Sequence, residues 1–238
     1  MKTGDIEYTV GDKKFSGFLA DGSNGKKTAG VLVAHEGGGM TGHPKERAKM
    51  LAELGYVAFA MDTFGEAITS REQAMATIGG LMGDLPTLRA RANAALDIVK
   101  GQPSVDPKRT AAIGFCFGGT TVLELARSGA DVGCVVGFHS GLTTTAPQDA
   151  KNIRCKVMDC LGADDPIIPA ESRDAFVKEM QAAKIDWRME LYGGAGHSFT
   201  NREVDAMNIP GFAYHATTDR RSWAAMRDLF DEVMGKVG

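Results

Sequence analysis

The segment Gly114-Phe115-Cys116-Phe117-Gly118-Gly119 is the most informative part of this sequence. It follows an apolar run over residues 111–115 and opens a segment with helical character. A residue at a sharp turn from strand to helix is held at the end of the strand, which is the setting of a nucleophile elbow. Glycines two residues away on either side remove side chains that would collide in so tight a turn. The segment therefore predicts a nucleophilic Cys116, with the helix N-terminus favouring its thiolate form.

Two other interpretations of this segment stay open. Cys116 is a buried cysteine in a tight glycine turn without chemistry, or the turn is a glycine loop that binds phosphate. A phosphate-binding loop is disfavoured, because the segment is not followed by the Lys-Ser/Thr of a P-loop and does not have the glycine spacing of a dinucleotide fingerprint. The strand–turn–helix setting therefore favours the nucleophile.

Outward from this turn, strand-like and helical segments alternate along the chain. We expect strands at residues 6–10, 14–19, 31–34, 56–61, 111–115, 132–138, 156–161 and 187–192, and helices at 44–54, 86–100, 119–127, 170–183 and 219–237. The first two strands flank Gly11-Asp12 and are typical of a β-hairpin. Strands joined by helices form parallel units, so we expect one α/β domain over residues 1–238, with a twisted, mostly parallel sheet and helices on both faces. A short lid is expected over residues 64–85.

A thiol nucleophile needs a base, and the base needs a carboxylate that orients it. His197, in the glycine-rich loop after the last strand, is the one histidine of five in that position. Asp164 and Asp165 follow the preceding strand and compete for the acid role. A glycine three residues before and a proline four residues after select Asp165. All these segments lie at the carboxyl ends of strands, at the same sheet edge as Cys116.

Acyl transfer also needs two N–H groups aimed at the developing oxyanion. Phe117, directly after the nucleophile, is expected to supply one, and Gly37, in the glycine-rich loop after the first buried strand, the other. A flexible tight turn is the alternative interpretation of that loop. His35 and His139 lie at strand ends, where such histidines either line a pocket or are core-edge residues.

Together the segments 114–119, 162–169 and 196–199, with Glu36, resemble the dienelactone hydrolase family over almost the whole chain. The resemblance implies an α/β-hydrolase fold and a carboxylic ester hydrolase of the carboxymethylenebutenolidase type. It also implies a thioester acyl-enzyme formed by a triad of Cys116, His197 and Asp165. In the family, the glutamate that matches Glu36 contacts the resting thiol and helps generate the thiolate when substrate arrives. A surface position in a glycine loop is the alternative for Glu36.

The substrate-binding residues depart from the family. Members that take the dienelactone carboxylate use arginines, one of them shortly after the catalytic histidine. Arg202 lies one residue later than expected and Asn201 stands in the matching place, while Arg71 and Arg89 are more typical of surface helix charges. We expect substrate contacts from Arg202 and from two further residues, His35 and Phe199. The expected substrate is a general small ester or lactone rather than dienelactone itself.

Composition and charge limit the kinds of partner that we expect for this protein. A net charge of -3 gives no basic face for nucleic acid, and no apolar stretch approaches the roughly 20 residues that span a bilayer. No apolar signal-peptide core opens the chain, so a cytoplasmic location is expected. No histidine and carboxylate cluster has ligand spacing, so we expect neither a metal nor another cofactor. The expected state is a monomer or small homo-oligomer acting on a small molecule.

Three other functions stay open on the same fold. A thioesterase or short-peptide hydrolase would use the same residues, and a non-catalytic ligand-binding protein would have lost one of them. A redox sensor would need a resolving cysteine near Cys116, for which Cys155 and Cys160 are the candidates. With Cys134, these two are otherwise expected to be small buried hydrophobic residues.

Overall fold

The computed structural model describes residues 1–237 and joins its strands in one eight-stranded sheet of order β1-β2-β4-β3-β5-β6-β7-β8. The strands are β1 Lys2–Val10, β2 Lys13–Asp21, β3 Thr28–Ala34, β4 Val57–Met61, β5 Val105–Phe115, β6 Cys134–Phe138, β7 Lys156–Gly162 and β8 Trp187–Tyr192. The six strands from β4 to β8 in this order are parallel, and β2 joins β4 in the antiparallel sense. The predicted mostly parallel α/β sheet of an α/β-hydrolase fold is confirmed.

The N-terminal hairpin forms at the predicted turn and extends further than predicted. Val10 pairs with Lys13, and Gly11 between them adopts a φ of 58°, in the left-handed region that glycine enters without strain. The ladder continues to the pair of Lys2 and Asp21. The sequence predicted only the part of each strand in which apolar residues alternate. Backbone hydrogen bonds between the strands do not depend on a buried face, so the pairing continues beyond that part.

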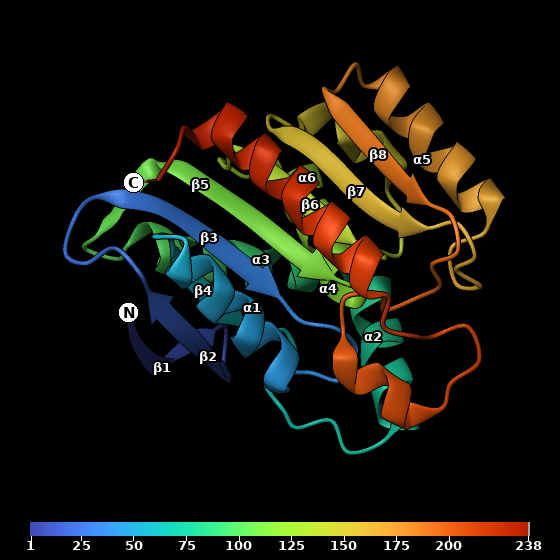
Figure 1. Cartoon of the computed structure of the whole chain (residues 1–238), viewed down its shortest axis with the longest axis horizontal. Coiled ribbons are helices and arrows are strands. Elements are labelled where there is room, and N and C mark those ends of the chain that lie inside the picture. Colours follow the sequence, from blue (N-terminus) through green and yellow to red (C-terminus); the bar gives the residue numbers. More distant parts are fainter. Residues whose placement is uncertain (238) are drawn as a thin grey trace.

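Helices cover both faces of the sheet, as Figure 1 shows. They are α1 Gly42–Glu53, α2 Arg71–Gly83, α3 Leu85–Lys100, α4 Phe117–Arg127, α5 Ala170–Ala182 and α6 Ala216–Met234, with 3-10 helices η1 Pro147–Asn152 and η2 Arg202–Met207. Helices α1 and α6 pack on one face, and α3, α4 and α5 on the other.

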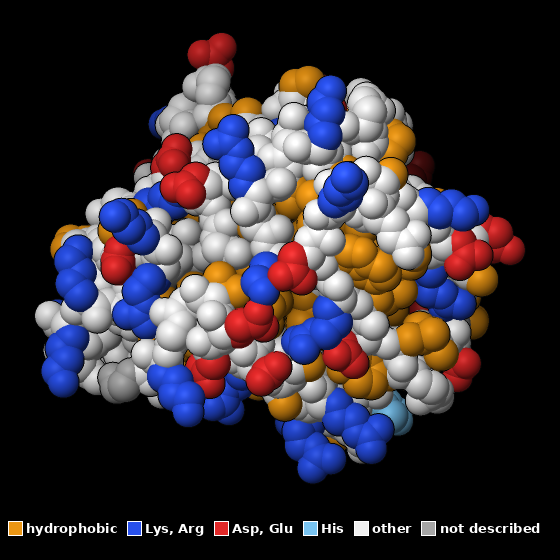
Figure 2. Space-filling view, turned by 90° about the horizontal axis from the view of Figure 1, so that it is seen from above, with side chains coloured by type: hydrophobic (Ala, Val, Ile, Leu, Met, Phe, Trp, Pro, Cys, Tyr) orange, Lys and Arg blue, Asp and Glu red, His pale blue; other side chains and the backbone are white. Residues whose placement is uncertain are grey.

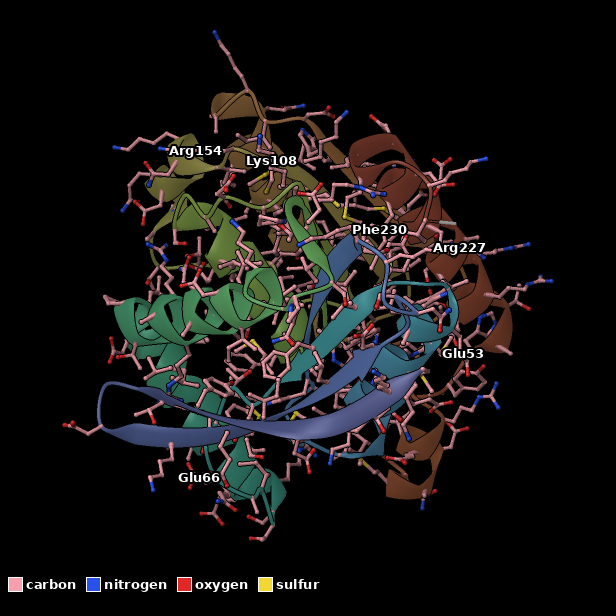
Figure 3. All side chains as sticks on the ribbon, turned by 90° about the vertical axis from the view of Figure 1, so that its left-hand side faces the viewer. Glu53, Glu66, Lys108, Arg154, Arg227 and Phe230 are labelled. Carbon is pink, nitrogen blue, oxygen red and sulfur yellow. The ribbon has the colours of Figure 1, made fainter. Side chains whose placement is uncertain are left out.

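The alternation of β3 shows how the two layers are built. Leu32 and Ala34 pack with residues of α3, α4 and α5, whereas Val31 and Val33 pack with those of α1 and α6. Every residue of β3 is therefore buried, and the sequence shows a continuous apolar run rather than alternation. Phe230 of α6, labelled in Figure 3, is fully buried in the core on this face, whereas the labelled charged residues are exposed.

The carboxyl ends of the parallel strands meet at one edge of the sheet, where α2 and η2 also lie (Figure 1). Helix α2 begins after Ser70, whose hydroxyl accepts a hydrogen bond from Gln73 N, and lies within the region predicted to form a short lid, residues 64–85. Gly79, Gly80 and Gly83 weaken its helical propensity, which is why this helix is absent from those predicted from the sequence. Within residues 1–237, no helix combines the length and apolarity needed to cross a membrane.

Candidate active site

Cys116 sits at the turn from β5 to α4 in strained backbone, with φ 54° and ψ -117°. A Cβ added at Gly114 would lie 1.9 Å from the carbonyl oxygen of Gly118, and one added at Gly118 would lie 2.2 Å from that of Ala34. Neither position tolerates a side chain, because both contacts are with backbone. The turn thus needs glycine on both sides of the cysteine, and the packed backbone holds the strained residue in place.

Three side chains from distant loops converge at this turn. His197 Nε2 lies 3.1 Å from Cys116 Sγ, and His197 Nδ1 lies 2.7 Å from Asp165 Oδ2. The other oxygen of Asp165 accepts a hydrogen bond of 2.8 Å from Ile167 N. Asp165 is buried, whereas the neighbouring Asp164 is exposed. The carboxylate is therefore fixed by two donors and holds the imidazole with its other nitrogen at the sulfur.

The loop that carries His197 is held by the segment before α6. His197 N donates to Gly211 O at 2.8 Å, and Ala213 N donates back to His197 O at 3.2 Å. The ring of Phe212 lies 4.6 Å from the imidazole, centroid to centroid. These contacts leave the imidazole little freedom to turn away from Cys116.

The electrostatics of the pair favour a charged imidazole. Burial alone would lower the pKa of His197, but the Cys116 sulfur and the Asp165 carboxylate together outweigh it and raise that pKa to about 10. A pKa of about 10 means that the proton stays on the imidazole at neutral pH, 3.1 Å from the Cys116 sulfur.

Two backbone N–H groups predicted to bind the oxyanion, those of Phe117 and Gly37, donate no hydrogen bond within residues 1–237. Phe117 N is the first donor of α4, and Gly37 N belongs to the loop after β3. Ile78 of α2 covers this loop, with its Cδ1 3.1 Å from the position of a Cβ at Gly37. Free N–H groups at a helix N-terminus and in a glycine loop suit a developing negative charge.

Glu36 is placed differently from the prediction that it contacts the resting thiol. Its Oε2 accepts a hydrogen bond from Asn201 Nδ2, and no hydrogen bond joins it to Cys116 Sγ in the part of the chain that the structure describes. Burial raises the pKa of Glu36, and the Asn201 hydrogen bond opposes that rise. Asn201 holds the carboxyl in this conformation, while the thiol is paired with His197.

A buried polar chain behind the nucleophile was missed in the sequence. His139 Nδ1 accepts a hydrogen bond of 3.1 Å from Cys116 N, and His139 Nε2–H donates to Thr200 Oγ1 at 2.8 Å. Arg47 Nη2 donates to Thr200 O and pairs with Asp219 at 2.9 Å. Only the position of His139 at a strand end hinted at this role, because its two partners, Cys116 and Thr200, come from distant segments.

The three residues predicted to contact substrate lie in different surroundings. His35 is fully buried, and its Nδ1–H donates to Glu36 O while Nε2 accepts from Thr63 N, so it supports the loop after β3. Phe199 is also fully buried and packs on the ring of His139 at 5.0 Å. Arg202 is exposed, with its guanidinium 5.2 Å from the ring of Tyr214. His35 and Phe199 have no exposed surface with which to contact a ligand. Substrate contact by the exposed Arg202 stays a prediction.

An apolar cluster adjoins the sulfur instead, and we call it the acyl-side cluster. Its buried members are Phe64, Leu81, Leu85, Leu88 and Phe117, and the half-buried Ile68, Ile78, Met82, Ala146 and Cys116 pack against them. The rings of Phe64 and Phe117 stack at 5.7 Å. The half-buried sulfur of Cys116 therefore faces solvent beside a wall of hydrocarbon.

The other cysteines lie in the hydrophobic core as free thiols. Cys155 and Cys160 pack on opposite faces of the sheet. Burial raises the pKa of Cys155 to about 12 and also raises that of Cys160. Neither thiol is placed or charged to resolve an oxidised Cys116. Among the described residues, no group of three or more metal-ligating side chains is arranged to hold a metal ion.

Comparison with known proteins gives a consistent result. The model of the dienelactone hydrolase family matches residues 15–234. A putative carboxymethylenebutenolidase of Methylorubrum extorquens is 25% identical over 240 aligned residues, which cover 95% of this chain and 80% of the relative. The Klebsiella pneumoniae structure described as a putative dienelactone hydrolase shares the fold at 19% identity, with a TM-score of 0.77 over 97% of this chain and 98% of that one.

More similar structures are known. A dienelactone hydrolase-like promiscuous phosphotriesterase from metagenomic libraries is 42% identical, with a TM-score of 0.94 over 98% of this chain and 99% of that one. The protein m3DLH is 48% identical, with a TM-score of 0.94 over 98% of both chains. The family model spans nearly the whole chain, including the turn of Cys116 and the loops of Asp165 and His197. The chain therefore belongs to the dienelactone hydrolase family.

Proposed function

We propose that the protein hydrolyses small carboxylic esters or lactones with Cys116 as nucleophile, His197 as proton carrier and Asp165 as the residue that orients His197. One observation carries the proposal. The sulfur lies 3.1 Å from His197 Nε2, and Nδ1 of the same ring lies 2.7 Å from Asp165 Oδ2. Nucleophile, base and orienting acid are thus within hydrogen-bond reach in the order that nucleophilic catalysis requires.

Acylation begins when the Cys116 thiolate attacks the carbonyl carbon and forms the C–S bond. The electron pair of the C=O bond moves to oxygen, and the N–H groups of Phe117 and Gly37 bind the resulting oxyanion. As the oxyanion collapses, the C–O bond to the alcohol breaks and the His197 imidazolium gives its proton to the leaving oxygen. A thioester remains on Cys116.

Deacylation repeats these steps with water. Neutral His197 removes a proton from water, the hydroxide attacks the thioester carbon, and the oxyanion forms on the same two N–H groups. Collapse breaks the C–S bond and releases the carboxylic acid. The thiolate and the imidazolium are restored, and Asp165 keeps Nδ1 of His197 protonated through both halves.

The test is hydrolysis of 4-nitrophenyl acetate and of a small lactone panel by the wild type and Cys116→Ala. We expect the variant to lose activity by at least about 10³-fold, because it lacks the nucleophile. Prior treatment with iodoacetamide should abolish wild-type activity and label Cys116. Activity that survives both the substitution and the alkylation would refute the assignment and favour a ligand-binding role. Parallel assays with acyl thioesters and short peptides measure how far the same site extends to thioesterase or peptidase activity.

A second candidate activity is hydrolysis of phosphotriesters. The 42% identical relative is described as a promiscuous phosphotriesterase. In this reaction the thiolate would attack phosphorus and displace an aryloxide, and water would then hydrolyse the phosphorus–sulfur bond. Release of 4-nitrophenol from paraoxon by the wild type but not by Cys116→Ala would support this activity. Loss of ester hydrolysis with retained paraoxon hydrolysis would show that the two reactions use different residues.

A further inference from the structure

We propose that this site selects uncharged, apolar acyl groups and rejects substrates whose acyl group carries a carboxylate. The inference rests on the proposed function, because it concerns the space beside the Cys116 sulfur. It goes beyond that function by naming the substrate class. It is based on the apolar side chains that pack with Cys116 and on the existing hydrogen bonds of the arginines in α1 and α3.

The walls beside the sulfur are hydrocarbon. Ile78 and Met82 lie in α2, Ile68 in the loop before it, and Ala146 directly before η1. All four are half-buried and pack in the acyl-side cluster with Cys116. These side chains offer a ligand neither a hydrogen-bond donor nor a positive charge. An acyl chain that extends from Cys116 along them is stabilised by burial of apolar surface, whereas a carboxylate there would lose its water without gaining a partner.

The cations of α1 and α3 are committed elsewhere. Arg89 donates to Glu124 through two nitrogens and to Asp149 at 2.6 Å. Arg91 donates to Thr63 O at 2.7 Å and lies over a core ring. Arg47 is buried and is paired with Asp219 at 2.9 Å. Drawing any of them to a substrate would break a charge-assisted hydrogen bond that is already formed.

Asn201 makes the other side of the site neutral as well. Its amide donates to Glu36 Oε2, and its Oδ1 accepts from Glu203 N, so both ends are occupied. Ring nitrogens of His43 and His139 lie 3.6 and 4.0 Å from the carboxylate oxygens of Glu36. Burial lowers the pKa of His43 to about 3 and that of His139 well below its usual range. Both histidines are therefore neutral at physiological pH. Neither of these two histidines adds a positive charge beside Glu36 that would attract an anionic substrate.

One cation needs a direct test. Arg71 opens α2 and is exposed, seven residues before Ile78 and therefore on the same side of the helix, two turns away. The proposal assigns it no part in binding the acyl group, because it lies in solvent beyond the apolar wall. Its removal should leave the charge preference unchanged.

The first experiment compares two esters that differ only in charge. The monoanion of mono-4-nitrophenyl adipate and its methyl ester have the same reacting carbonyl, the same leaving group and nearly the same length. We expect kcat/KM for the methyl ester to exceed that for the anion by at least about 100-fold after subtraction of the uncatalysed rates, which corresponds to about 2.7 kcal/mol. Equal values would overturn the proposal while leaving the nucleophile assignment intact.

The second experiment separates the proposal from turnover. N-ethylmaleimide and N-(2-carboxyethyl)maleimide alkylate thiols by the same reaction, and only the second carries a carboxylate. The ratio of their rates with Cys116, divided by the same ratio for 2-mercaptoethanol, measures the charge preference of the site alone. We expect at least about tenfold discrimination against the anion. A normalised ratio near one would overturn the proposal even if no ester were hydrolysed.

Two variants complete the test. Ile78→Arg places a cation in the wall and should reduce the discrimination between the adipate esters by at least about tenfold, mainly through a lower KM for the anion. Arg71→Gln should leave the ratio of the two esters unchanged. A selective loss of anion hydrolysis in Arg71→Gln would show that Arg71 binds the carboxylate, which contradicts the proposal. Loss of all ester hydrolysis by Cys116→Ala, measured beside them, reports on the proposed function separately.

Discussion

Replacing Asp165 by Asn removes one charge from the site while keeping the shape of the side chain. In the wild type, one carboxylate oxygen accepts from His197 Nδ1 at 2.7 Å and the other from Ile167 N at 2.8 Å. In the variant, the amide oxygen keeps the Ile167 contact, and the NH₂ group then faces His197 Nδ1. Nδ1 must then accept a hydrogen bond, so the ring keeps its proton on Nε2 alone, and this N–H points at the sulfur 3.1 Å away.

The magnitude follows from two losses. A hydrogen bond to a charged group contributes about 1.5–3 kcal/mol, so its removal alone slows the reaction about 10- to 150-fold. The reversed tautomer also removes the lone pair that should take a proton from water during deacylation. The same substitution in a serine triad lowers kcat about 10⁴-fold. We therefore expect kcat to fall by about 10³- to 10⁴-fold, with KM little changed.

Asp164→Asn is the matched control. Asp164 is exposed and next in sequence, so its substitution should change kcat/KM by no more than about twofold. Both variants would be assayed with 4-nitrophenyl acetate, and their folding checked by circular dichroism and thermal unfolding. A folded Asp165→Asn variant with activity within tenfold of the wild type would refute the reasoning, as would a large loss in Asp164→Asn.

The remaining predictions concern stability. A Cβ at Gly119 would lie 1.9 Å from Ser140 Oγ, so Gly119→Ala should lower the free energy of unfolding by about 1–3 kcal/mol in urea titrations; an unchanged value would contradict this contact. Thr200→Val leaves His139 Nε2–H without its acceptor and should cost about 1–3 kcal/mol in the same assay, whereas a neutral effect would mean that the buried chain contributes nothing. Burial raises the pKa of Asp159 from 3.8 to about 7. The unfolded chain therefore loses this proton first, and the free energy of unfolding should decline as pH rises from about 4 to 7. Asp159→Asn should remove that decline, and identical pH profiles for variant and wild type would count against it.

The fold was largely predictable, because helices on both faces leave β3 and its neighbours uniformly apolar and the connecting helices periodic. The residues at which individual helices and strands begin were harder to predict. Helix α6 begins at Ala216 rather than at the predicted Asp219. His215, directly before the helix, accepts a hydrogen bond from Thr218 N and fixes its start. β5 begins at Val105, well before the apolar run, because pairing with β3 rather than hydrophobicity extends it.

The candidate site was predictable where local geometry imposes residue types. The turn of Cys116 requires glycine at fixed positions, and loops after parallel strands share one edge, so Asp165 and His197 could be named from order alone. The contacts of Glu36 with Asn201 join positions 165 residues apart, and the chain from Cys116 to His139 and Thr200 is similarly non-local. No sequence spacing marks such pairs, which is why a role for Thr200 was not foreseen.

The expectation of substrate contacts from His35 and Phe199 failed for a physical reason. Both follow strands at the correct edge, but both side chains turn into the interior and are fully buried. Position at the edge of a sheet shows where a site lies without showing which side chains face it. The apolar residues of α2, by contrast, lie in a segment with weak helical propensity, and their approach to Cys116 emerged only in the structure.

The measurement that tests the central claim most directly is the capture of an acyl-enzyme. Wild-type protein mixed with excess 4-nitrophenyl acetate would be quenched in acid within the first turnovers and analysed by intact mass and peptide mapping. The account predicts one added acetyl group on the peptide that carries Cys116, released by hydroxylamine as a thioester should be, and no adduct in Cys116→Ala. Two results would contradict the assignment of Cys116. One is turnover without any adduct on Cys116, and the other is an acetyl group that accumulates on another residue and is released at the rate of turnover.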